Sequence, residues 1–261
     1  MAAIAAVFLM PAAAQAARCG STGAGFDDWK EEFAIEAKAQ GVKPKALAAL
    51  ASTSYATATI RADRGQKSFK LSLAAFMQKR GAAAIVSRGR GMKRANAALF
   101  DRIEKRYGVP PGPLLAIWGM ESGFGSVTGS QNTLSAVATL AYDCRRSEYF
   151  TEHLYAALAL VERGVLSASS RGAMHGEVGH TQFLPKNVRL YGADGDGDGR
   201  VNLNSKADAL ASTANFLRGH GWTPGEGYQP GQPNFGAIQG WNAAIVYQKA
   251  IAIMARQIDG E

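Results

Sequence analysis

The sequence predicts a mainly α-helical protein. Apolar residues recur at three- and four-residue spacing along most of the 261-residue chain, and glycine or proline separates the periodic stretches. Strand signals are scarce, and no internal repeat or low-complexity linker interrupts the pattern. Because 47% of the residues are hydrophobic, the chain can bury a substantial core, so disorder is not its expected state.

The helices can be placed in order along the chain. The first has an apolar face and runs to Gly41; that face consists of Phe26, Trp29, Phe33 and Ala37. Pro44 suits the first turn of the second helix. Further helices are expected over 66–86, 91–107, 113–121, 132–142, 147–163, 205–219 and 238–258. The stretches 164–204 and 220–237 are expected to be loops.

Residues 1–17 are expected to be an export signal. A short apolar run is followed by small residues, and Ala14-Gln15-Ala16 resembles a signal-peptidase site. The run is too short to span a bilayer. An alanine-rich arm is the alternative, because no basic residue precedes the apolar run. We therefore expect a monomer exported to the periplasm, with no stable membrane span.

The two cysteines, Cys19 and Cys144, suit one disulfide bond in an oxidising compartment. Such a bond would tie the start of the mature chain to its core. The alternative is a pair of buried thiols. The export signal favours the disulfide.

Positive charge is concentrated in residues 61–106. This segment carries thirteen Lys or Arg residues against three acids, a net charge of +10 (thirteen minus three), while the whole chain carries +8. A basic face of this kind suits a polyanion, although a solvated helix surface is the commoner explanation. No aromatic residues are interleaved for base stacking, so a nucleic-acid partner is not expected.

A carboxylate is placed in an apolar stripe of the segment PPGPLLAIWGMESGFGS. Pro113 suits the start of a helix, and Gly123 is expected to stop it. Glu121 lies four residues beyond Ile117 and three beyond Trp118, on the same helix face. Burial there would raise the pKa of Glu121, which a general acid needs. The alternative is a Glu paired with an Arg or reaching solvent at the helix end.

The string 175-HGEVGH-180 invites a zinc site, but its H-x-E-x-x-H spacing and its glycines do not suit one helical face. Zinc is therefore not expected. Glu177 is the second candidate for the catalytic acid. Its glycine-flanked setting predicts a solvated carboxyl of ordinary pKa, so Glu121 is preferred.

The stretch 194-DGDGDGRVNLNSKAD-208 opens like an EF-hand loop, with acids at alternate positions and glycine sixth. A standard loop closes with a Glu at its twelfth residue, where this chain has Ser205. An Asp-Gly turn without metal is therefore one interpretation.

Several blocks together resemble the lytic murein transglycosylases of the membrane-bound-B type. They are AIWGMESGFGS, NTLSAVATLAYDCRRSEYF, GEVGHTQFLP, DGDGDGRVNL, ASTANFLRGHGW and WNAAIVY, in that order between residues 26 and 259. The resemblance implies one catalytic region over 18–261, with a helical part (18–110) before a lysozyme-like core (111–261). It also implies activity on the glycan strands of peptidoglycan, without an organic cofactor.

In this family one Glu performs the whole reaction. It protonates the oxygen between N-acetylmuramic acid and N-acetylglucosamine, and then acts as base while the muramoyl C6 hydroxyl attacks C1. The product carries a 1,6-anhydromuramoyl end. The resemblance assigns this role to Glu121, whereas most glycosidases use two carboxylates. A hydrolytic muramidase and a non-catalytic, calcium-dependent wall-binding module remain the alternatives.

The same resemblance implies further site residues. Gln182 in HTQFLP corresponds to a Gln that lines the sugar cleft, and Asn242 and Tyr247 in WNAAIVY correspond to residues near the acid. Ala173 stands where the family often has Ser. The aromatic side chains of Tyr142, Phe183 and Trp241 could stack on sugars or belong to the core.

Relatives in this family carry a longer, fifteen-residue calcium loop, and in this chain the fifteenth residue is Asp208. The resemblance therefore implies a structural calcium site with oxygen ligands. Its ligands would be the carboxylates of Asp194, Asp196, Asp198 and Asp208 and the backbone carbonyl of Arg200.

Overall fold

The computed structural model describes residues 17–65 and 71–260, and it confirms the mainly helical prediction. Within these residues there are thirteen α-helices, one short 3-10 helix and one two-stranded sheet. Except for Ala17, the expected export signal lies outside the described residues.

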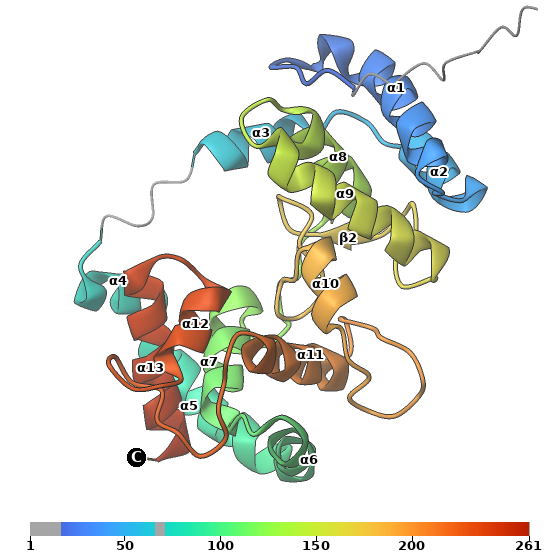
Figure 1. The fold of residues 1–261 in the computed structure, drawn as a ribbon. Helices are drawn as coiled ribbons and strands as arrows, with labels where there is room; N and C mark the ends of the chain where they lie inside the picture. Colours follow the sequence, from blue (N-terminus) through green and yellow to red (C-terminus); the bar gives the residue numbers. More distant parts are fainter. Residues whose placement is uncertain (1–16, 66–70, 261) are drawn as a thin grey trace, which may run out of the picture.

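The helices are arranged in two lobes (Figure 1). The upper lobe in this view contains η1 (Gly23–Gly25), α1 (Phe26–Ala39), α2 (Pro44–Ala51), α3 (Thr57–Arg64), α8 (Thr133–Tyr142) and α9 (Ser147–Glu162). Helices α8 and α9 pack on each other, and α2 packs against both of them. In this lobe, helices from the start of the described chain therefore pack against helices α8 and α9 from its middle.

The lower lobe contains α4 (Leu73–Lys79), α5 (Ala82–Ala95), α6 (Ala97–Tyr107), α7 (Pro111–Ser122), α11 (Lys206–Gly219), α12 (Phe235–Trp241) and α13 (Ile245–Asp259). Helix α7 packs mainly against α13 and α5. The chain before and after residue 110 thus shares one core.

Helix α10 (Pro185–Tyr191) lies between the lobes, in contact with α9 on one side and α11 on the other. A small antiparallel sheet pairs β1 (Gln131–Asn132) with β2 (Arg171–Gly172), with Gln131 opposite Gly172. Because β2 precedes the GEVGHTQFLP segment, this pairing fixes where that segment starts.

Several predicted boundaries were wrong, each for a local reason. Of the helix expected over 66–86, residues 66–70 lie outside the described residues, and the rest is divided at Gly81, which has a left-handed φ of 67° and separates α4 from α5. Helix α5 then continues to Ala95, beyond the expected end. The helix expected over 238–258 is divided at Asn242, whose backbone is extended. Helix α10 lies inside the expected loop 164–204, and α3 was not predicted.

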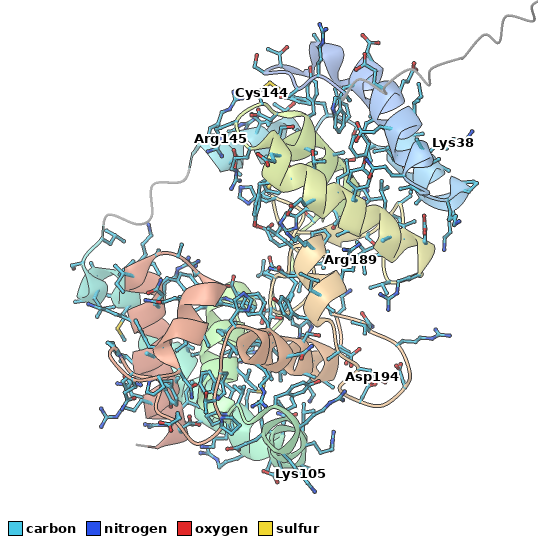
Figure 2. All side chains as sticks on the ribbon, in the orientation of Figure 1. Lys38, Lys105, Cys144, Arg145, Arg189 and Asp194 are labelled. Atoms are coloured by element: carbon cyan, nitrogen blue, oxygen red, sulfur yellow. A yellow bond between two sulfur atoms is a disulfide. The ribbon has the colours of Figure 1, made fainter. Side chains whose placement is uncertain are left out.

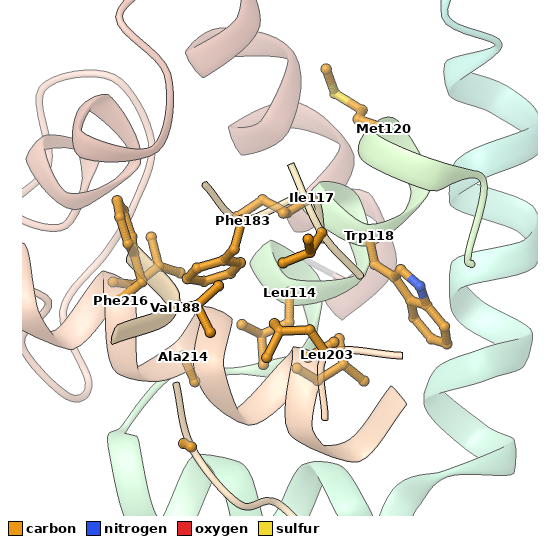
Figure 3. Packing of buried hydrophobic residues seen from close by; sticks show 14 of the residues in the cluster. Leu114, Ile117, Trp118, Met120, Phe183, Val188, Leu203, Ala214 and Phe216 are labelled. Atoms are coloured by element: carbon orange, nitrogen blue, oxygen red, sulfur yellow. The ribbon is translucent and has the colours of Figure 1, made fainter. Parts of the chain in front are cut away.

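Helix α7 is the most deeply buried element of the lower lobe. Eleven of its twelve residues are buried, and the exception is Glu121. The spacing around Glu121 predicted one apolar face, whereas α7 is enclosed on nearly all sides, because its residues are apolar all round. Figure 3 shows Leu114 and Ile117 of α7 close to Phe183, which precedes α10.

The predicted disulfide between Cys19 and Cys144 is present, with Cα atoms 5.0 Å apart. Backbone hydrogen bonds flank it: Gly20 N–H donates to the Tyr142 carbonyl (2.9 Å) and Cys144 N–H donates to the Gly20 carbonyl (3.0 Å). Cys144 lies at the top of the upper lobe (Figure 2). The bond ties the start of the described chain to α8.

No helix in the described part of the chain is long and apolar enough to cross a membrane.

Removing the disulfide is expected to lower the free energy of unfolding by about 2–4 kcal/mol, because the bond closes a long loop in the unfolded chain. The measurement is urea unfolding of the wild type and of a Cys19→Ser/Cys144→Ser variant, each with and without reductant. Reductant should destabilise the wild type and leave the variant unchanged. Equal unfolding midpoints for the oxidised wild type and the variant would contradict the prediction.

Candidate active site

Glu121 is the penultimate residue of α7, and the turn after it is strongly constrained. Gly123 ends the helix with a left-handed φ of 57°. Ser122 Oγ accepts a hydrogen bond from Gly125 N–H (2.9 Å) and donates one to the His180 carbonyl (2.5 Å). The end of α7 is therefore tied directly to the loop that contains Gln182.

Two donors from the last helices of the chain fix the Glu121 carboxyl group. Tyr247 Oη on α13 donates to Glu121 Oε1 over 2.6 Å, and Trp241 Nε1 on α12 donates to the same oxygen over 2.9 Å. No described residue donates a hydrogen bond to Oε2. This oxygen can therefore carry a proton toward the cleft.

Glu121 opens into a cavity of about 350 Å³. Its lining is formed by Glu121, Tyr149, Glu177, Gln182, Phe183, Leu184, Asn187, Phe216, Gly240, Trp241 and Asn242. A larger hollow, of about 730 Å³, lies beside Arg163 and Arg200. We favour the smaller one as the reaction site, because it alone contains an acid at the end of a buried helix.

Burial raises the pKa of Glu121. The hydrogen bonds from Tyr247 and Trp241 and the positive charge of Arg80 act in the opposite direction, and the negative charge of Glu177 adds to the increase. The balance favours the protonated carboxyl group. Burial, with the Glu121 charge beside it, raises the pKa of Tyr247 well above its ordinary value, so this phenol remains a donor.

Gln182 and Asn242 both line the cavity that contains Glu121. Gln182 has an unusual left-handed φ of 59°, and its Nε2 donates to the Gly179 carbonyl over 2.7 Å. Asn242 Oδ1 accepts from Ala244 N–H over 2.9 Å, at the start of α13. The left-handed backbone of Gln182 is strained for a residue with a side chain, and such strain is often found at functional sites.

Sequence reasoning did not find every group around Glu121. Trp241 was considered for sugar stacking, and its hydrogen bond to the acid was missed. The guanidinium of Arg80 lies over the Tyr247 ring, 5.7 Å from its centroid, and was not singled out. Tyr142 does not line the cavity; it packs against Phe26 and Trp29 in the upper lobe. Only the folded chain brings these distant segments together.

The two histidines of HGEVGH have separate environments. His175 Nδ1 lies 3.0 Å from Glu177 Oε1, whereas the His180 ring stacks on Trp118 with centroids 5.6 Å apart. Glu177 is not the solvated carboxyl that was predicted. Its side chain is 22% exposed, and its pKa is lowered because the hydrogen bonds and charge of His175, with backbone N–H groups, outweigh the effect of burial.

The aspartate loop brings three carboxylates together, on the right of the molecule in Figure 2. Oxygens of Asp194, Asp196 and Asp208 lie within 4.8 Å of one another. Asp198 is not part of this group, and its Oδ1 accepts from Arg200 N–H over 2.8 Å. Three converging carboxylates form the kind of oxygen donor set that calcium prefers.

Asp208 joins the loop to the start of α11 and is 1% exposed. Its two oxygens accept from Gly195 N–H and Asn202 N–H, over 2.9 and 2.7 Å. Burial raises the pKa of Asp208, these hydrogen bonds lower it, and the neighbouring aspartate charges raise it further. A cation between the three carboxylates would relieve this repulsion.

Comparison with known proteins identifies the family. The model of the Transglycosylase SLT domain family matches residues 25–232, so the chain belongs to this family of lytic transglycosylases. The chain is 36% identical over 144 residues to the membrane-bound lytic murein transglycosylase B of Escherichia coli K12. That alignment covers 52% of this chain and 40% of the relative, so the match spans less than half of that protein.

Solved structures have the same fold. SltB3 of Pseudomonas aeruginosa, in complex with NAG-anhNAM-pentapeptide, has a TM-score of 0.83 and 28% identity, covering 91% of this chain and 80% of SltB3. Slt35 of Escherichia coli, in complex with calcium, has a TM-score of 0.77 and 22% identity, covering 93% of this chain and 96% of Slt35. The second likeness concerns the fold alone.

Glu121→Gln is expected to stabilise the fold at neutral pH and to lose this advantage in acid. Gln can still accept both hydrogen bonds through its carbonyl oxygen. Because the folded state raises the pKa of Glu121, its favourable contribution is present below the unfolded pKa and is lost as pH rises through the folded pKa. The advantage of Gln should grow by roughly 1.4 kcal/mol for each pH unit between these values.

Urea unfolding of both proteins at several pH values measures this effect. Glu32→Gln, a change at an exposed position of α1, is the control and should show no such trend. A stability difference between Glu121→Gln and the wild type that does not change with pH would contradict the prediction.

Proposed function

We propose that the chain is a peptidoglycan lytic transglycosylase that cleaves the β-1,4 bond between N-acetylmuramic acid and N-acetylglucosamine, with Glu121 as its only acid and base. The observation that carries this proposal is the Glu121 carboxyl group: it lies at the end of a buried helix, two donors hold one oxygen, and the other can carry a proton. Family membership supports the substrate class.

In this reaction Glu121 Oε2 first donates its proton to the glycosidic oxygen. The carboxylate formed then accepts the proton of the muramoyl C6 hydroxyl as that oxygen attacks C1. Tyr247 and Trp241 keep Oε1 in place during both steps and stabilise the intermediate carboxylate. Water is not consumed, and the product is a 1,6-anhydromuramoyl end. The anhydro sugar bound by SltB3 supports this outcome.

Gln182 and Asn242 are proposed to hold the sugar chain beside Glu121, since both line the same cavity. Trp241 also lines it and offers partly exposed ring surface to a sugar, whereas Phe183 is 2% exposed and packs beneath Trp241 as part of the core. We place the enzyme in the periplasm as a single catalytic region over residues 18–261, acting as a monomer. The internal disulfide and the relative's membrane-bound designation support a location in the cell envelope.

Mass analysis of the muropeptides released from purified sacculi tests the activity. The wild type should release anhydromuropeptides, and Glu121→Gln should lower the rate by at least roughly 100-fold. Glu32→Gln is the control and should match the wild type. Products heavier by one water molecule, with reducing muramic acid, would instead establish a hydrolytic muramidase. A wild type that binds sacculi and never cleaves them would be a wall-binding module.

We also propose that the aspartate loop binds one structural calcium ion. Asp194, Asp196 and Asp208 would supply carboxylate oxygens, as their convergence supports, and Asp198 and the Arg200 carbonyl would complete the site. Calcium in the Slt35 complex supports the choice of ion. The ion would hold the loop that follows α10 against the start of α11, and it would take no part in bond cleavage.

Calcium is expected to raise the thermal midpoint of the wild type by several degrees, because it binds the folded state only. Asp208→Asn should abolish this increase, and Asp101→Asn, at an exposed position of α6, should retain it. The measurement is thermal unfolding after chelation, with calcium or magnesium added back. An unchanged midpoint of the chelated wild type on adding calcium would refute the calcium site.

A further inference from the structure

The cavity contains a second carboxylate, from Glu177, in addition to that of Glu121. Two carboxyl groups in one partly buried site resist being ionised together, because each negative charge raises the cost of the other. Where the surroundings of such a pair differ, one group holds the charge and the other holds the proton. The contacts of Glu121 and Glu177 determine which of the two carboxyl groups holds the charge and which holds the proton.

Glu177 is the better site for the negative charge. His175 approaches it twice: its backbone N–H donates to Oε2 over 2.9 Å, and its Nδ1 lies 3.0 Å from Oε1. Both carboxylate oxygens therefore have a partner. Glu121 has donors on one oxygen only and lies at the end of an apolar helix.

The backbone carbonyl of Glu177 is packed closely against the end of the small sheet. Its carbonyl accepts from Ala173 N–H over 2.8 Å, and it approaches Gly172 so closely that a Cβ at Gly172 would lie 1.9 Å from it. Gly172 belongs to β2, and its lack of a side chain permits this approach. The sheet thus holds the backbone of Glu177 in place.

A buried acid, Asp63, lies on the other side of His175. Its Nε2 lies 3.8 Å from Asp63 Oδ1, and the Asp63 side chain is 2% exposed. Arg145 and Arg146 form ion pairs with Asp63. This separation is too long for a hydrogen bond, and His175 Nε2 has no hydrogen-bond partner among the described residues, so Asp63 acts on the imidazole only as a nearby buried charge.

We propose that Glu177 is a positioning residue that acts through Glu121: a fixed negative charge in the cavity wall, locked by His175, which holds Glu121 in its proton-donating state. The inference rests on the proposed function of Glu121 as the acid. From the sequence, Glu177 was considered only as an alternative catalytic acid to Glu121. The two carboxylates instead divide the charge and the proton between them.

The other charged and titratable groups nearby are few. Arg80 and Tyr247 face Glu121, and Arg146 and Tyr149 face Glu177 together with His175. The charge of Arg80 lowers the pKa of Glu121, whereas that of Glu177 raises it. The pair Arg80 and Glu177 therefore provides two variants with opposite expected effects on one carboxyl group.

The test measures the carboxyl titration of Glu121 directly, by ¹³C NMR of glutamate-labelled protein, with the signal assigned by Glu121→Gln. Glu177→Gln should lower the pKa of Glu121, because it removes a negative charge from the same cavity. Arg80→Met retains an apolar stem and should raise it. Glu32→Gln should leave it unchanged. His175→Gln should lower it by less than Glu177→Gln, because Glu177 then loses its strongest partner.

The alkaline limb of kcat/KM on sacculi should move in the same direction as each titration, because Glu121 must be protonated to act. At a pH on that limb, Glu177→Gln should be slower than the wild type, by about tenfold for each unit by which the measured pKa of Glu121 falls, and activity should recover at lower pH. A purely structural role would lower the rate without moving the pH profile.

Two failures are distinguishable. If Glu121→Gln clears sacculi as fast as the wild type, the proposed function of Glu121 fails, whatever Glu177 does. If Glu121 is essential and its pKa is the same or higher in folded Glu177→Gln, the role of Glu177 fails alone. Should Glu177→Gln not fold, an unchanged Glu121 pKa in folded His175→Gln would overturn the proposal.

Discussion

The structure depends on one constraint, which is that a carboxyl group must sit at the end of a helix that is otherwise buried. Helix α7 has no polar face, so its position is set by apolar contact with α5, α11 and α13. Glu121 is where this helix meets the cavity, and Tyr247 and Trp241 compensate for its loss of hydration. The C-terminal helices therefore serve both as packing partners of α7 and as the hydrogen-bond donors of the acid.

The two lobes contribute different parts of the electrostatic environment. Groups of the lower lobe set the direct contacts of Glu121. The upper lobe contributes the ion-paired group of Asp63, Arg145 and Arg146, and Asp63 lies 3.8 Å from His175, the partner of Glu177. The disulfide and the aspartate loop lie away from this cavity, one in the upper lobe and the other before α11. Their effects on the site are expected to act through the stability of the lobes.

The features that could be predicted from the sequence are those set by local residue spacing or by a family pattern. The apolar stripe around Glu121, the cysteine pair and the late acid of the aspartate loop all follow from spacing or resemblance. Helix divisions at Gly81 and Asn242 were missed because a single non-helical residue, left-handed at Gly81 and extended at Asn242, interrupts an otherwise continuous apolar period. Trp241 and Arg80 were missed as partners of Glu121 because they lie far from it in the sequence. Helical periodicity predicts the face of a helix that is buried, but not which other segment packs against it.

Glu177 shows how far local context can mislead. Glycines on both sides predicted a flexible, hydrated carboxyl group, yet those glycines allow the tight turn that brings His175 back onto the side chain, with Gly176 at a φ of 89°. The same residues that predict mobility in an isolated peptide permit close backbone packing in a fold. A buried charge is tolerated here because every carboxylate oxygen of Glu177 has a partner, while Glu121 lacks one on Oε2. Burial is the largest cause of the raised pKa of Glu121, and the complete pairing of Glu177 makes that residue the better place for the charge.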